Sequence, residues 1–430
     1  MTEGHRQRLT RELLLGYFEE AFTPRSAWQV GMEFETMGVD AATGVRIPYD
    51  GSRASVRSCL EHYLGLRGGD PAYEGENLIG IDSTWGAITL EPGGQVEWSS
   101  RPQADLVLLA EQLGAHLRSL DATADALGIR WLGDAVDPDT ALADVPWMPK
   151  ARYKILRPYL GARGRLAHRM MTQTASIQCA FDFEDPGDWR RKFRAAALLA
   201  PVAVALFANS PRADGGETGY RSYREAIWRE TDPDRCGLPS VIFDPGFGIE
   251  AWLEWVLDTP AIFLHRVRGL VPAGGVPFRD LMRHTGCEAV GMEDWELHLS
   301  AIFTEVRSYS YIEVRSADMQ PAPTIMAVPT LYTGILYDPQ SLGEALELCV
   351  GHDHHEAWSD AMDSAAKLGM DGTAGGRSIH ELAERVVALA LEGLERNPAH
   401  AGDAESAGRP LLTLAEHRRL DPGAVPGGRS

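Results

Sequence analysis

Four segments of the chain share one alternation of polar and apolar side chains. In the segment 88–98 (ITLEPGGQVEW), apolar residues take the even positions, and Glu91, Gln95 and Glu97 take odd ones. Successive side chains of a strand point to opposite faces of its sheet, so this pattern predicts one apolar face and one face of carboxyl and amide groups. The segments 28–35, 172–182 and 305–316 repeat the design. A solvated outer face would explain one such strand, but four favour a common polar wall.

If the four strands are neighbours in one antiparallel sheet, that wall carries five carboxylates. They are Glu33, Glu35, Glu91, Glu97 and Glu313. Two unit charges about 4 Å apart repel by about 4 kcal/mol at an effective dielectric near 20, so either some of these groups are protonated or a cation lies among them. No His/Cys ligand set accompanies the glutamates, and a hard cation such as Mg²⁺ or Mn²⁺ therefore fits best.

A nucleotide is a further expectation from this wall. Mg²⁺ usually takes few protein carboxylates and completes its shell with water and phosphate. Arg315 lies two residues from Glu313 on the same predicted face, where a guanidinium can meet phosphate. The chain has no GxxxxGK[ST] loop, and the GFG at 246–248 is too short for a dinucleotide fingerprint. ATP would therefore be held through metal.

The composition excludes two classes of partner. The net charge is −20, from 61 acidic and 41 basic residues, which argues against a nucleic-acid backbone or an anionic membrane. Five scattered cysteines without a CxxC pair, and an N-terminal sequence without the apolar stretch of a signal peptide, favour a reducing cytoplasmic location. The most apolar run, 195–208, is too short to span a bilayer and is predicted to be a buried helix.

The order of the patterns favours one α+β domain. Strand-like alternation at 28–40, 172–182 and 303–317 is interspersed with helical periodicity at 104–127, 188–208, 249–257 and beyond 340. A Gly-, Arg- and Asp-rich loop is expected at 211–240. No composition break marks a domain boundary. We therefore expect a single catalytic domain at 1–395 with a helical C-terminal part, followed by a partly mobile tail at 396–430.

Seven motifs in order across residues 31–318 resemble a known family. They are GMEFETMGVD, ITLEPGGQVEWSS, RMMTQTASIQCAFD, ALFANSP, WRETDPDRC, WELHL and YIEVRSAD. Together they resemble the glutamate–cysteine ligase family of the plant and bacterial type, which includes the ligase of ergothioneine biosynthesis. The resemblance implies a glutamine-synthetase-like fold, in which a curved antiparallel sheet forms a funnel-shaped active site with helices packed outside.

The resemblance also implies a reaction. ATP would phosphorylate the side-chain carboxylate of L-glutamate, and the amino group of L-cysteine would displace the phosphate to give γ-glutamylcysteine. The implied metal-binding residues are Glu33, Glu35, Glu91, Glu97, Glu313 and, where related enzymes have another polar residue, Gln178. Arg315 would be catalytic, Tyr311 would bind the nucleotide, and Arg224, Trp228 and Arg235 would bind the amino-acid substrates. The arginines alternatively form surface pairs with Glu225, Glu230 and Asp232.

Three other functions remain open at this stage. A ligase of the same chemistry could use another amine, because a few pocket side chains select it. Two of the glutamates could instead form the acid–base pair of a nucleotide-independent hydrolase. A metal-binding protein without catalysis would leave the arginines unexplained. The remaining candidate residues are not expected to take part in function. We expect His352, His354 and His355 to be exposed and Cys179 to pack in the core. We expect His298 to lie in the core or next to the site residues, and assign it no role.

Overall fold

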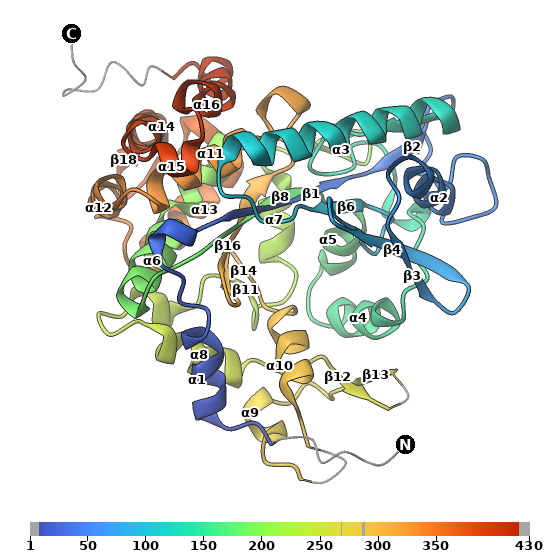
Figure 1. The fold of residues 1–430 in the computed structure, drawn as a ribbon, viewed down its shortest axis with the longest axis horizontal. Helices are drawn as coiled ribbons and strands as arrows, with labels where there is room; N and C mark the ends of the chain where they lie inside the picture. Colours follow the sequence, from blue (N-terminus) through green and yellow to red (C-terminus); the bar gives the residue numbers. More distant parts are fainter. Residues whose placement is uncertain (1–7, 268, 286–288, 421–430) are drawn as a thin grey trace.

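The computed structural model describes residues 8–267, 269–285 and 289–420, and is built around one antiparallel sheet (Figure 1). Its eight strands have the order β15-β16-β8-β1-β6-β5-β4-β3. Their bounds are β1 (Val30–Thr36), β3 (Asp70–Glu74), β4 (Asn77–Ser83), β5 (Gly86–Leu90), β6 (Val96–Ser99), β8 (Ser176–Phe181), β15 (Val306–Ser308) and β16 (Ile312–Asp318). The α+β class and the antiparallel sheet are confirmed.

The strand register makes the four polar segments neighbours, as the sequence predicts. On β1, Glu33 lies opposite Gln178 of β8, and Glu35 lies opposite Glu97 of β6. At the next pair outward, Arg307 of β15 lies opposite Glu313 of β16. The polar groups of β1, β6, β8, β15 and β16 therefore form one continuous wall.

The other face of the sheet is the core of the molecule. Phe34 lies opposite both Trp98 and Ile177, and all three side chains are buried. The helices that cover this face include α3 (Leu106–Leu127), α6 (Pro186–Leu206) and α11 (Ala327–Leu336). The helix α3 ends at Leu127 and is capped by Gly128, whose φ of 73° suits a glycine. As predicted, most of the apolar run 195–208 forms the buried half of α6.

The polar face is covered by a second group of helices. These include α4 (Ala151–Gly161), α5 (Ala167–Gln173) and α7 (Tyr223–Arg229). Figure 1 shows α3 on one side of the central strands, and α4 and α5 on the other. The helix α7 lies within the expected loop 211–240; Ser222 caps it, its side chain accepting from the backbone N–H of Glu225.

The remaining elements complete the outer layers. The other helices are α1 (Arg11–Glu19), α2 (Val56–Arg67), α8 (Ile249–Asp258), α9 (Phe278–Leu281), α10 (Met292–Leu299), α12 (Pro339–Leu348), α13 (His355–Leu368) and α14 (Ile379–Arg396). Short strand pairs are β2 (Gly38–Asp40) with β7 (Ile129–Trp131), β9 (Arg212–Ala213) with β10 (Gly216–Glu217), β11 (Cys236–Gly237) with β14 (Phe303–Thr304), β12 (Phe263–Arg266) with β13 (Gly269–Pro272), and β17 (Thr373–Ala374) with β18 (Arg377–Ser378). No helix of the described residues is long and apolar enough to cross a bilayer.

Two predicted strands are wrong in extent. The segment 172–182 begins as the end of α5, where the hydroxyl of Thr172 donates to the carbonyl of His168, and β8 starts only at Ser176. The segment 303–317 is not one long strand. It turns back on itself at residues 309–311, so that β15 and β16 form a hairpin.

The expected tail at 396–430 contains two further helices. They are α15 (Pro398–Ala401) and α16 (Ala404–Arg418), and α16 packs against α11 and α14. Leu411 and Leu414 of α16 are buried in the common core. Residues 396–420 therefore contribute packed helices to the fold, and residues 421–430 lie outside the described part of the chain.

Candidate active site

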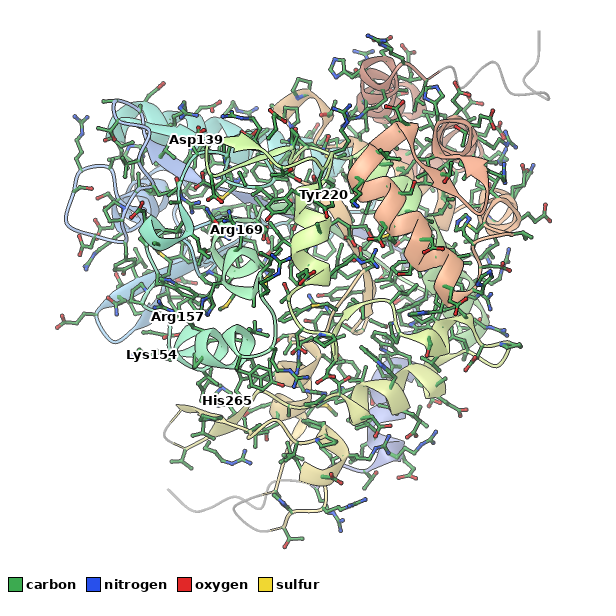
Figure 2. All side chains as sticks on the ribbon, turned by 180° about the vertical axis from the view of Figure 1, so that it is seen from behind. Asp139, Lys154, Arg157, Arg169, Tyr220 and His265 are labelled. Carbon is green, nitrogen blue, oxygen red and sulfur yellow. The ribbon has the colours of Figure 1, made fainter. Side chains whose placement is uncertain are left out.

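The polar wall borders a cavity of about 220 Å³ between the sheet and the helices α4, α5 and α7. Figure 2 views the molecule from behind, where Lys154 and Arg157 mark α4, Arg169 marks α5, and Tyr220 lies just before α7. The wall contributes Glu33, Glu35, Glu97, Gln178, Arg307 and Arg315, and the β5–β6 turn contributes Glu91. Lys150, Arg152 and Tyr153 come from the start of α4, and Arg224 and Trp228 from α7.

The β5–β6 turn is fixed by close packing against the end of α5. The side chain of Gln95 is buried and donates to the carbonyls of Met171 and Thr174. Gly93 approaches the backbone of Thr172 so closely that a β-carbon there would lie 2.1 Å from its carbonyl oxygen. These contacts hold Glu91 over the cavity, although it lies outside the strands.

Three glutamates of the cavity have raised pKa values. Burial and then repulsion by Glu97 raise the pKa of Glu35 to about 8 and that of Glu91 to about 7. The same two causes raise the pKa of Glu33 well above its ordinary value, with Glu313 adding to the repulsion. These carboxyl groups therefore form a set that lacks sufficient positive charge. We call Glu33, Glu35, Glu91 and Glu97 the carboxylate half of the wall.

Glu313 has the opposite electrostatics. Burial acts to raise its pKa, but Arg307 and Arg315 outweigh burial and hold the pKa below its ordinary value. Nε of Arg307 donates to Oε2 of Glu313 over 2.8 Å, and Nη1 of Arg315 donates to the same oxygen over 2.9 Å. These three residues form the arginine half of the wall.

Gln178 joins the two halves. Its carbonyl oxygen accepts a hydrogen bond from Arg315, and its amide nitrogen donates to Oε1 of Glu35 over 3.4 Å. Glu35 is held further by Ser176, whose backbone N–H donates to its Oε2 over 2.7 Å. Because an amide both donates and accepts, Gln178 satisfies a cationic and an acidic neighbour at once.

The carboxylate half suits a hard divalent cation. Its donors are all oxygens, and a bound cation would lower the raised pKa values of Glu33, Glu35 and Glu91. Within the described residues, no three His, Cys, Asp or Glu side chains already converge on one metal position. A cation would therefore complete its shell with water and substrate oxygens, as Mg²⁺ commonly does.

The substrate residues expected from the sequence divide into two groups. Arg224 and Trp228 line the cavity, and Arg224 is buried, with Nη2 donating to the carbonyl of Arg315 over 3.0 Å. Arg235 does not line it. Its guanidinium is wholly buried and donates to Asp232 over 2.7 Å and to the carbonyls of Pro260 and Ala301.

Tyr311 does not line the cavity either, whereas Tyr309 does. The hairpin between β15 and β16 interrupts the alternation at this point, since the backbone N–H of Tyr309 donates to the carbonyl of Tyr311. The two rings lie beside each other with centroids 5.3 Å apart. The structure thus places most of the predicted site residues of the wall and α7 around the cavity. Glu313, Arg235 and Tyr311 do not line it, and Glu313 lies behind Arg307 and Arg315 as their shared acceptor.

Comparison with known proteins decides the family. The sequence model of glutamate-cysteine ligase family 2 matches residues 29–426 of this chain. The chain belongs to glutamate-cysteine ligase family 2. It is 36% identical over 392 residues to the chloroplastic glutamate–cysteine ligase of Solanum lycopersicum, covering 90% of this chain and 74% of that protein. It is 35% identical to the chloroplastic glutamate–cysteine ligase B of Oryza sativa subsp. japonica, covering 90% and 78%.

A solved structure shares the fold of this family member. The crystal structure of a bifunctional glutathione synthetase from Pasteurella multocida superimposes with a TM-score of 0.51 and 12% sequence identity. The match covers 97% of this chain and 50% of that chain. At this identity the similarity concerns the fold alone.

Sequence reasoning missed the cationic side of the cavity in this family member. Lys150 and Arg152 lower the pKa of Glu91, against burial and Glu97, which raise it. Nζ of Lys150 donates to the carbonyl of Leu90 over 3.1 Å, and Tyr153 donates to the same carbonyl. The available signal was the run 150–157 (KARYKILR), which carries four basic residues in an acidic chain.

The histidines and Cys179 take no part in the cavity. His298 is a core residue, which is one of the two positions expected for it. Its Nε2 lies 2.9 Å from the carbonyl oxygen of Val256. His354 and His355 are exposed as predicted, but the expected exposure of His352 is wrong. His352 is buried against α6, with Nε2 3.1 Å from the carbonyl of Leu198. Cys179 packs on the apolar face of β8, as expected.

Proposed function

We propose that this protein is an ATP-dependent ligase that joins the γ-carboxylate of L-glutamate to the amino group of L-cysteine. The reaction proceeds through γ-glutamyl phosphate and gives γ-glutamylcysteine, ADP and phosphate. One observation supports it above the others: in a member of glutamate-cysteine ligase family 2, a carboxylate half and an arginine half form one wall of a single cavity. Phosphoryl transfer needs such positioning and charge neutralisation more than covalent chemistry.

We assign the carboxylate half to divalent cations, Mg²⁺ or Mn²⁺. The assigned ligands are Glu33, Glu35, Glu91 and Glu97, because repulsion by Glu97 contributes to the raised pKa of each of the other three. When bound, the cations neutralise phosphate oxygens of ATP. Gln178 keeps the carboxylate of Glu35 in place, and Glu313 fixes the arginines rather than acting mainly as a ligand.

The cationic residues then have separate tasks. Arg315 faces the cavity between Gln178 and Trp228, with its guanidinium 5.8 Å from the Trp228 ring, and it stabilises the transferring phosphoryl group. Lys150 and Arg152 on the opposite side hold further phosphate oxygens. Arg224 binds the carboxylate of an amino-acid substrate, since its buried Nε has no hydrogen-bond partner within the described structure.

L-Cysteine is the proposed amine, and another amine is the alternative. Trp228 and Phe303 line the cavity with their rings 5.5 Å apart, and they offer an apolar surface to a thiol-bearing side chain. The product would serve as a precursor of glutathione or ergothioneine. We place the reaction in the cytoplasm, in keeping with the four described cysteines, all of which are free thiols.

An amine-panel assay tests this function. Release of ADP and phosphate is measured with ATP, L-glutamate and Mg²⁺, and with L-cysteine or L-serine as the amine. L-Cysteine is expected to give the highest kcat/KM. Glu97→Gln should abolish this turnover, whereas Glu76→Gln makes the same chemical change at an exposed turn and should leave it unaffected. Higher kcat/KM with another amine would reassign the substrate, and hydrolysis without nucleotide would replace the ligase by the carboxylate-pair hydrolase.

A further inference from the structure

A second cavity lies behind α7 and shares no lining residue with the active-site cavity. Its volume is about 420 Å³, and its walls come from α7, the segment 233–240, α8 and α13. We call it the α7–α13 cavity. The residues used below are Glu225 of α7, Ser240, Trp255 of α8, and His355, Trp358 and Ser359 of α13.

Glu225 is an unsatisfied acid in this cavity. Its side chain is 1% exposed, and its buried Oε1 has no hydrogen-bond partner within the described structure. A second buried carboxyl group, that of Glu305, is close enough to contribute, after burial, to raising the pKa of Glu225. A buried acceptor without a donor is costly, so this oxygen is a place where a ligand can gain affinity.

The nearby arginines do not supply the hydrogen-bond donor that this oxygen lacks. Arg229 is committed to Asp363 over 2.8 Å and to the hydroxyl and carbonyl of Ser359. Arg224 is turned towards the active-site cavity, where it donates to the carbonyl of Arg315. Asp318 is a third carboxyl group near Glu225, and it takes up Arg224, whose Nη1 lies 3.9 Å from its Oδ1. The back of α7 therefore has an excess of carboxyl groups over unengaged cations.

The other residues that line the α7–α13 cavity indicate which kind of cation it can bind. Trp255, Trp358 and His355 present aromatic surface, which attracts an organic cation and packs against an apolar stem. A bare divalent ion would find few oxygen donors here. The free acceptor on Glu225 requires an N–H donor, which a primary ammonium has and a quaternary ammonium lacks.

We propose that the α7–α13 cavity is a second binding site for a small primary alkylammonium ion, whose N–H groups donate to Oε1 of Glu225 while its stem lies against Trp255 and Trp358. This site is separate from the position of the amine substrate. Because the ammonium favours the ionised form of Glu225, binding releases the proton that this carboxyl group holds in the free protein.

Isothermal titration calorimetry with n-propylammonium in the absence of ATP tests the site. We expect saturable binding, with tetramethylammonium and 1-propanol binding on the order of tenfold more weakly, because each lacks either the N–H donors or the charge. Titrations in buffers of different ionisation enthalpy should show proton release. Equal binding of tetramethylammonium, or no proton release, would overturn the proposed contact with Glu225.

Three variants separate this cavity from the active site. Glu225→Gln should weaken n-propylammonium binding on the order of tenfold or more. Ser240→Trp fills the mouth of the cavity from an exposed position and should block binding even if the first variant does not fold. Glu35→Gln alters only the active-site cavity and should leave binding intact. Loss of binding in Glu35→Gln with retention in the other two would locate the ion in the active site and refute the proposal, as would no binding to the wild type.

Discussion

Two glutamates on the same wall should respond to pH in opposite directions when the protein is free of metal. Glu35 is half-buried and Glu313 buried in the polar wall, but the pKa of Glu35 is raised to about 8 by desolvation and neighbouring carboxylates. The pKa of Glu313 is lowered because two arginines outweigh its burial. Replacing each by Gln removes the charge with little change of shape, so the pair of variants isolates electrostatics.

The sign and size follow from linkage. Between the ordinary pKa of 4.5 and about 8, the folded protein holds a proton on Glu35 that the unfolded chain releases. Stability from this group is thus fully present below pH 4.5 and is lost as the pH rises towards 8. Each pH unit in that interval is worth about 1.4 kcal/mol, so the loss at pH 7 is roughly 3 kcal/mol. Glu91, with a pKa of about 7, adds to it in the same direction.

The pKa of Glu313 is shifted in the opposite direction, so its contribution to stability depends on pH in the opposite sense. Its lowered pKa means that ionised Glu313 stabilises the fold at neutral pH and loses this effect as the pH falls below its ordinary range. Glu313→Gln leaves the guanidinium groups of Arg307 and Arg315 buried without their shared carboxylate. Breaking a buried ion pair in this way costs about 3–5 kcal/mol.

Urea unfolding in EDTA at pH 5 and pH 8 provides the assay. The wild type should be less stable at pH 8, Glu35→Gln should be more stable than the wild type at pH 8 and nearly equal to it at pH 5, and Glu313→Gln should be less stable at pH 8. Excess Mg²⁺ should restore the wild type at pH 8 and have less effect on Glu35→Gln. If both variants change stability in the same direction at pH 8, the division of the wall into two halves is refuted.

Four further predictions concern other parts of the molecule. Arg315→Lys should lower kcat by about two orders of magnitude with little change in the KM for glutamate, because lysine lacks the planar guanidinium that contacts the transition state. A normal kcat with a raised KM would make Arg315 a substrate-binding residue. Arg235→Lys should lower stability by about 3–5 kcal/mol in urea without raising the KM for glutamate; the reverse result would return Arg235 to the substrate site. Turnover should stop in excess EDTA and resume with Mg²⁺ or Mn²⁺; full turnover in chelator would exclude the metal role of the glutamates. A chain ending at residue 395 should fail to fold in circular dichroism, whereas one ending at Leu420 should fold; a folded shorter chain would contradict the packing of α16.

The polar wall was predictable because its signal is local. A strand reverses its side chains at every residue, so the faces of Glu33, Glu35 and Glu97 follow from their positions alone, and the hairpin 86–99 fixes its own partner. The pairing of β1 with β6 and β8 is not local. The sequence predicted only that the four polar segments share one sheet, because a charged face is tolerable where several such faces border one cavity, and it did not predict which strands pair.

The failures occur where backbone hydrogen bonding overrides the alternation. Thr172 and Thr174 fit a strand pattern, but their hydroxyls donate to carbonyls four residues earlier, in or just after the last turn of α5. Tyr309 and Tyr311 share a parity, but the chain turns between them. Parity predicts a face only while a strand continues, and no side-chain pattern marked these two ends.

The site residues that lie outside the sheet were harder to predict because they come from separate elements. Arg224 and Arg235 occur in one segment that is rich in both basic and acidic residues. The residues around them therefore do not distinguish one arginine from the other. Both are buried, and the structure separates them by hydrogen bonding. The guanidinium of Arg235 donates to Asp232 and to three other oxygen atoms, whereas Nε of Arg224 has no partner among the described residues. Which arginine is available to a ligand depends on tertiary hydrogen bonds that sequence spacing does not encode.

Glu313 explains how strong cations and unneutralised carboxylates can share one wall. Without it, Arg315 would be free to turn fully towards Glu35 and Glu97. The resulting ion pairs would lower the pKa of Glu35 and compete with a divalent cation. Because Oε2 of Glu313 accepts from both Arg315 and Arg307, much of their charge is offset within the arginine half. Gln178 then separates the halves with a neutral group that satisfies both. Glu33, Glu35 and Glu91 are consequently left with raised pKa values that an added cation would lower, and Arg315 stays oriented at the cavity without neutralising the carboxylate half.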